Sequence, residues 1–310
     1  MLQRILTVAF NTYREAVRAR ILWGLVAVAF GVALFSLAVG AFTLEDAPRV
    51  VANMGATTIS VFSIAVAILI GATSLYRELE MKTILPLLAR PIRRSEYLVG
   101  KYVGVMLVVG VFIMAEGGLV LMMSAAMGGR SVVLVMIVGV AVAAAALLGA
   151  WLLPRLRTYV PIPWAAGMLI AGALLCSVAR DSQSLVLASS ALTCLEVGII
   201  AGVAMLFSSF STPFLTTIFT LGVLVVGRNA DLLARMQENI FGTTIKQVSA
   251  VLAKVVPNLH VYVPTRPLLT GEATDADLLV YIGMAAVQTL GWTIGLLAVS
   301  AFVFQRRDFL

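Results

Sequence analysis

The chain has 310 residues, of which 61% are hydrophobic and only 12% are charged. Soluble domains carry about 25% charged residues, so this composition excludes a soluble protein and predicts an integral membrane protein. The formal net charge of +7 would also suit a nucleic-acid binder, so the positions of the charges must decide between these two explanations. The two cysteines lie in apolar stretches and cannot make a disulfide framework.

The N-terminal segment, residues 1–20, is predicted to form an amphipathic helix. Its apolar residues recur at three- and four-residue steps, and arginines occupy the other face. A cationic helix of this kind suits the anionic cytoplasmic leaflet, where it would serve as an elbow before the first span. The alternative is a helix that binds a protein partner.

The rest of the chain is predicted to be an all-α polytopic bundle of about eight transmembrane helices. A hydrocarbon core of about 30 Å needs about 20 apolar helical residues. Pro213, at the end of the run Ser-Ser-Phe-Ser-Thr-Pro that begins at Ser208, divides one long apolar stretch into two spans. Residues 131–179 could instead form a re-entrant segment or one broken helix. The predicted spans are residues 21–44, 52–75, 102–128, 131–153, 163–179, 185–207, 212–228 and 279–304.

The basic residues predict the orientation of these spans. With eight spans, 14 of the 22 Lys and Arg residues fall on the side that holds both termini. The positive-inside rule makes that side cytoplasmic, so we expect a multi-pass protein of the inner membrane with residues 229–278 outside the cytoplasm. Topology therefore explains the net charge, and we expect no nucleic acid as a partner.

Residues 76–101 are the most informative segment. They connect two spans on the cytoplasmic side and begin with alternating charges. A charge-laced amphipathic helix here could dock into a groove on a soluble partner. Composition alone would favour a solvated positive-inside loop.

The order of residues in this segment resembles the cytoplasmic coupling segment of ABC-2 type transporter permeases. The family pattern is an acidic and basic helix, a Thr, a Leu-rich turn, Ala-Arg/Lys-Pro, an Arg, and an aromatic residue before Gly-Lys. Lys82, where many members have Gly, resembles the branch of nitrous-oxide-reductase maturation permeases. The matching residues are Glu78, Glu80, Lys82, Thr83, Leu87, Leu88, Ala89, Arg90, Pro91, Arg94, Tyr97, Gly100 and Lys101.

The resemblance extends to other parts of the chain. Ser208–Phe214 is similar to a second, short coupling turn, and Pro257-Asn258-Leu259 to the sequence before the last span. The family core has six spans, so residues 131–179 look like an inserted pair.

The family implies the membrane subunit of an ATP-driven exporter. Its expected partners are membrane lipids, a second permease copy or paralogue, and two cytoplasmic ATPase subunits, which would hold ATP and Mg. The residues expected to couple to the ATPase are Arg77, Glu78, Glu80, Lys82, Thr83, Arg90, Pro91, Arg93, Arg94, Ser208 and Pro213.

The chain is not expected to be an enzyme. Its only Gly-Lys pair, Gly100-Lys101, has Ser95 and Tyr102 where a phosphate-binding loop needs Gly and Ser/Thr. His260 is the only histidine, and no zinc or haem spacing occurs, so we expect neither a metal nor a bound cofactor.

Two acids, Glu116 and Glu196, fall near the middle of predicted spans. A carboxylate at this depth is costly, so it is expected to face the bundle interior or a cavity. The pair could line the substrate path or share a proton. Each could instead be a protonated acid that is hydrogen-bonded for packing.

A secondary transporter with no ATPase partner is the main alternative function. Such proteins often show internal repeats with paired broken helices, and the two halves of this chain show no convincing repeat. An intramembrane enzyme would need a cluster of catalytic groups at membrane depth, which two isolated glutamates do not supply.

Overall fold

The computed structural model describes residues 2–43, 46–80, 93–235 and 277–305, and between the last two ranges residues 246–249, 251–252, 255–264 and 269. Within these ranges the chain is almost wholly helical and has no strand. The main elements are α1 (Leu2–Arg18), α2 (Arg20–Ala41), α3 (Ala47–Glu80), α5 (Arg94–Met127), α6 (Val132–Leu152), the 3₁₀ helix η1 (Pro154–Tyr159), α7 (Pro161–Leu175), η2 (Cys176–Val178), α8 (Arg180–Ser208), α9 (Pro213–Arg228), α10 (Ala230–Ala234), η3 (His260–Tyr262) and α13 (Leu278–Gln305).

The all-α membrane fold predicted from the sequence is confirmed, with a different number of full-length spans. Seven helices in the described part of the chain are long and apolar enough to cross a membrane. The seventh predicted span, residues 212–228, corresponds to α9, which has 16 residues. At 1.5 Å per residue α9 is about 24 Å long, which is less than the thickness of a hydrocarbon core.

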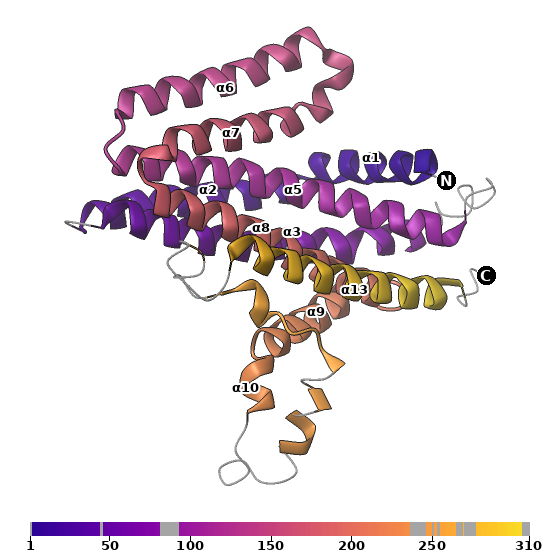
Figure 1. Cartoon of the computed structure of the whole chain (residues 1–310). Coiled ribbons are helices and arrows are strands. Elements are labelled where there is room, and N and C mark those ends of the chain that lie inside the picture. Colours follow the sequence, from indigo (N-terminus) through magenta and orange to yellow (C-terminus); the bar gives the residue numbers. More distant parts are fainter. Residues whose placement is uncertain are drawn as a thin grey trace.

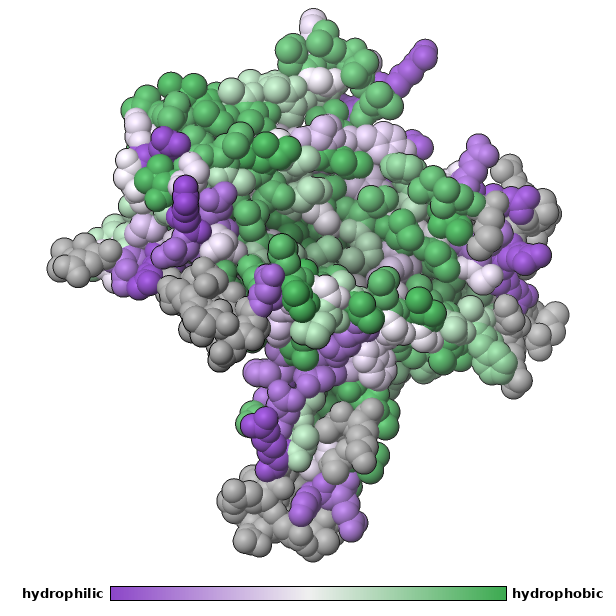
Figure 2. Space-filling view, in the orientation of Figure 1, coloured by the Kyte–Doolittle hydropathy of each residue, from purple (hydrophilic) through white to green (hydrophobic). Residues whose placement is uncertain are grey.

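The core of the bundle consists of α3, α5 and α8. More than half of the most apolar stretch of each is buried, whereas α2 and α13 lie at the periphery. In Figure 1 the long helices run side by side, and both termini lie at the same end of the bundle. We call this the terminal end. Figure 2 shows hydrophobic residues along the side of the bundle and hydrophilic residues at its ends and around α10.

The N-terminal helix α1 is amphipathic as predicted, but it packs lengthwise on α5. Arg4 forms an ion pair with Glu96 at 3.8 Å, and a Cβ atom built on Gly104 would lie 2.5 Å from the Cβ atom of Thr12. Both pairs share the same sequence offset, so the two helices run parallel. The prediction of a helix that lies flat on the leaflet is therefore wrong, because the groove at Gly100 and Gly104 accepts α1 along the direction of α5.

The inserted pair predicted for residues 131–179 forms two separate helices, which excludes a single broken helix. Gly129, with φ of +96°, makes the tight turn before α6. α7 begins at Pro161, two residues before the predicted span, and packs closely on α5 because Gly118 and Gly172 bring the two backbones together. α6 lies outside α7, as Figure 1 shows, and Val135 is its one buried residue.

Candidate functional site: a buried ion pair between three helices

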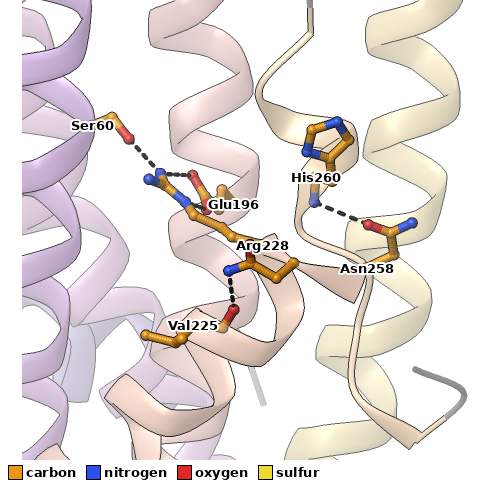
Figure 3. A network of polar contacts seen from close by, with 7 residues as sticks. Ser60, Glu196, Val225, Arg228, Asn258 and His260 are labelled. Carbon is orange, nitrogen blue, oxygen red and sulfur yellow. Dashed lines mark hydrogen bonds and ion pairs between the residues drawn. The ribbon is translucent and has the colours of Figure 1, made fainter. Parts of the chain in front are cut away.

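The candidate site is a polar network that joins α3, α8 and α9 inside the bundle. Glu196 on α8 is 1% exposed. Its two carboxylate oxygens accept hydrogen bonds from Nε and Nη2 of Arg228, at 2.8 and 2.9 Å. Nη2 also donates to Oγ of Ser60 on α3, at 2.8 Å, and Figure 3 shows Arg228 reaching between the two helices. This bidentate geometry is the strong form of an arginine–carboxylate contact.

The position of Arg228 at the end of α9 explains why it can reach Glu196. α8 and α9 form an antiparallel hairpin around the turn that precedes Pro213, and the short α9 ends beside the middle of α8. Asn229 closes α9, since its backbone N–H donates to the carbonyl of Val225. The guanidinium of Arg228 is therefore held beside the middle of α8 by a helix that ends partway along the bundle.

The segment before the last helix seals this helix end. The N–H of Leu259 donates to the carbonyl of Gly227 at 3.0 Å. Asn258 donates from Nδ2 to Asp231 at 2.8 Å, and its Oδ1 accepts the N–H of His260 at 3.0 Å, as Figure 3 shows for His260. The Pro-Asn-Leu sequence thus has a structural role next to the ion pair.

Glu196 is not the isolated acid that the sequence suggested, because it forms an ion pair with Arg228. The ion pair joins residues on different helices, so no local spacing indicates it. One signal was available: the stretch 212–228 is too short to cross the core. A helix of that length places its last residue near the depth of Glu196, where a cation would find a counter-charge.

Glu116 lies in a different environment from Glu196. It is fully buried on α5, and neither carboxyl oxygen has a hydrogen-bond partner in the described structure. The neighbouring Gly117 faces Ser190 of α8, whose hydroxyl also lacks a partner among described residues. The idea that Glu116 and Glu196 share a proton is not supported, because both oxygens of Glu196 bind Arg228.

The described residues of the predicted coupling segment lie at the terminal end of α3 and α5. Arg77, Glu78 and Glu80 lie on the last turns of α3. Arg93 is exposed and directly precedes α5. Ser208 is the buried last residue of α8, and Pro213 is the first residue of α9, so the predicted break is confirmed. Four further predicted residues lie outside the described part of the chain: Lys82, Thr83, Arg90 and Pro91.

Helix α5 begins at Arg94, inside the segment predicted as 76–101. Arg94 donates from Nη1 to the carbonyl of Phe304 on α13, at 3.2 Å. Tyr97, Gly100 and Lys101 are buried, so this part of the motif serves helix packing.

Lys101, the last residue of the predicted coupling segment, joins three helices. Its side chain is 1% exposed, and its ammonium group lies 3.5 Å from Glu15 on α1 and 3.5 Å from the carbonyl of Ser74 on α3. Tyr13 on α1 stacks on Tyr159, and its burial there raises its pKa to about 12. The terminal end is therefore a tightly packed joint between α1, α3 and α5.

The part of the chain that the structure describes contains no cluster of His, Cys, Asp and Glu that could hold a metal ion. Among family models, the one described as ABC-2 family transporter protein matches residues 6–309. A search of curated proteins found no match.

Proposed function

We propose, because the chain belongs to the ABC-2 family of transporter proteins, that this permease exports its substrate from the cytoplasm and takes its energy from a separate ATPase subunit. The observation that carries the proposal is the family match over nearly the whole chain. The geometry supports the same proposal. A continuous helix connects each candidate coupling segment to the same ion pair, Arg228–Glu196.

The first route runs along α3. This helix extends from the candidate coupling residues at 77–80 to Ser60, which accepts a hydrogen bond from Arg228. The distance along the helix is about 30 Å at 1.5 Å per residue. A displacement at the coupling end would reach Arg228 without crossing a loop.

The second route runs along α9. This helix begins at Pro213, directly after the short turn that follows Ser208, and ends at Arg228. A push on this turn would move Arg228 along the axis of α9, while Glu196 stays on α8. The two routes meet at the guanidinium of Arg228. Relative movement of α3, α8 and α9 would therefore change the contact between Arg228 and Glu196.

Export would then follow from rocking of α3 and α9 against α8 between inward-facing and outward-facing arrangements. The bidentate geometry allows two discrete states, one with the pair intact and one with Arg228 displaced. In the proposed assembly, two ATPase subunits hold ATP and Mg, and a second permease copy or paralogue completes the path. The basic terminal end would face the cytoplasm, where these ATPases bind.

The test is whether a soluble ATPase co-purifies with the chain. We expect R90E/R93E to abolish this association, because both charges lie in or next to the coupling segment. Arg94 is avoided because it binds α13 through Phe304. The matched control is R155E/R157E, which makes the same charge change in η1 and should leave the ATPase bound.

Two results would contradict the proposal. Unchanged association of R90E/R93E would remove the docking assignment. Absence of any ATPase from the purified wild-type protein, together with transport that needs no ATP, would favour a secondary transporter.

A further inference from the structure

A nearly apolar cleft lies between α6 and α7, the two inserted helices, and η1, which connects them. Its volume is about 540 Å³, which is within the range of small-molecule and cofactor sites. α6, η1 and α7 each contribute to the walls. The lining side chains include Val142, Ala146, Leu153, Tyr159 and Trp164, and Gly149 leaves open space on α6.

The connection at one end of the cleft carries two arginines, which do not line the cleft itself. Arg155 and Arg157 lie on η1, between the lining residues Leu153, Leu156 and Tyr159. Both arginines are exposed, and neither forms an ion pair with a described residue. A 3₁₀ turn at the end of an apolar cleft therefore presents two guanidinium groups without a counter-charge.

Helix α1 brings further positive charge to the same place. Tyr159 of η1 packs against Phe10 and Tyr13 of α1, with ring centroids 5.6 and 6.0 Å apart. Arg14 follows Tyr13 directly and is exposed, as is Arg18 one turn later. The acid on this stretch of α1, Glu15, is paired with Lys101. Four exposed arginines, Arg14, Arg18, Arg155 and Arg157, thus lie on α1 and η1, the two elements that meet at Tyr159.

The remaining surface of the hairpin fits a lipid environment. α6 buries only Val135, and Trp151 near its end is 77% exposed. Trp151 and Trp164 flank η1 in sequence, and Tyr159 is its last residue. Such aromatic residues are enriched where a helix leaves the hydrocarbon core for the headgroup region. The cleft thus has an apolar interior and aromatic lining residues at the end where the two arginines of η1 lie.

We propose that this cleft binds one anionic phospholipid. Its acyl chain would fill the space between α6 and α7, and its phosphate would bind the guanidinium groups of Arg155 and Arg157. The planar guanidinium matches phosphate oxygens in a bidentate way. The lipid would hold α6 against the rest of the bundle. The contacts of α6 with the protein itself are few, since Val135 is its one buried residue. This assigns the inserted pair a role that is separate from energy coupling.

The test measures phospholipid binding to the purified full-length protein in detergent, after the co-purified lipid has been removed. Phosphatidylglycerol and phosphatidylcholine are titrated separately, and bound lipid is counted by native mass spectrometry. We expect phosphatidylglycerol to bind with one tight site and phosphatidylcholine to bind more weakly. R155Q/R157Q should weaken phosphatidylglycerol binding about 30-fold, given the usual contribution of each basic residue near an anionic lipid.

A second variant tests the cleft independently of charge. A Cβ atom on Gly149 meets no other atom within 4 Å, so G149L should insert its side chain into the cleft without disturbing the fold. We expect it to reduce the binding of phosphatidylglycerol. Gly24 on α2 also has open space, so G24L is the matched control. R49Q/R180Q removes two charges elsewhere and controls for net charge.

Three results would overturn the proposal. These are retention of phosphatidylglycerol by R155Q/R157Q at wild-type affinity, equal binding of both lipids by the wild-type protein, and equal loss of binding in G149L and G24L. Thermal unfolding of every variant shows whether the protein is folded. If R155Q/R157Q does not fold, G149L against G24L still decides whether the cleft holds the lipid.

Discussion

Arg228 and Glu196 face each other across the α8–α9 hairpin and form two parallel hydrogen bonds of 2.8 and 2.9 Å. The two side chains differ in their contact with solvent, since 32% of the arginine is exposed against 1% of the glutamate. Loss of the arginine would leave a buried carboxylate, whereas loss of the carboxylate would leave a cation that can reach the surface. The pair should therefore respond unequally to substitution.

The first prediction uses this asymmetry. R228Q should destabilise the protein by about 3 kcal/mol, because removal of one partner leaves an uncompensated buried charge. E196Q should cost less, and the double variant E196Q/R228Q should cost less than the sum of the two. Thermal unfolding of the purified protein measures the three values as a double-mutant cycle. Additive losses would mean that the pair does not interact in the folded protein.

The second prediction concerns the contact between α1 and α5. A Cβ atom on Gly100 would lie 2.7 Å from the Cβ atom of Val8 and 2.9 Å from the carbonyl oxygen of Ile5, so G100A should push α1 away. Overpacking of this kind costs about 1–3 kcal/mol. Gly110 on the same helix meets no atom within 4 Å, which makes G110A the control. We expect faster proteolysis of the first 20 residues in G100A alone. Equal protection of both variants would contradict the lengthwise packing of α1.

The sequence was sufficient to predict those features that depend on a single helix and on the lipid or water around it. The bilayer imposes length and apolarity on each span separately, so α2, α6 and α13 could be located from hydropathy. The predicted positions of helix ends outside the bilayer were less accurate. α3 continues to Glu80 and α5 starts at Arg94, because water permits a polar stretch to stay helical beyond the hydrocarbon core.

Features that depend on two helices could not be predicted in the same way. The contact of Arg228 with Glu196 requires the register of α8 against α9, and the burial of Lys101 requires α1 in its groove. Gly100 fits a coupling motif equally well as a linker residue or as a packing residue. Only the position of α1 distinguishes these roles.

The third prediction tests the topology of the inserted hairpin. α6 and α7 place η1 at the terminal end of the bundle, where Tyr159 contacts α1. A cysteine at Arg157 should therefore react with a membrane-impermeant maleimide only after the cells are permeabilised. A cysteine at Arg180, at the other end of α7, should react in intact cells. Each is introduced after Cys176 and Cys194 have been replaced by Ser. Labelling of both in intact cells would show that α6 and α7 do not cross the membrane as a pair.

The fourth prediction separates the two roles open to Glu116. Its carboxyl oxygens are buried and have no hydrogen-bond partner among the described residues, so this group does not contribute to stability through a contact of its own. A buried polar group without a partner is unfavourable, and E116L should therefore raise the stability by about 1–2 kcal/mol, while E116Q should change it little.

Thermal unfolding provides the measurement, and E196L is the matched control, because it removes a carboxylate of the same type that does have a partner. We expect E196L to destabilise the protein, since it leaves Arg228 without a counter-charge. If E116L destabilises the protein as much as E196L does, Glu116 has a packing role that requires its carboxyl group. If E116L is stable but its complex with the ATPase no longer transports, the acid has been kept for the substrate path at a cost in stability, as is usual for functional groups inside a membrane.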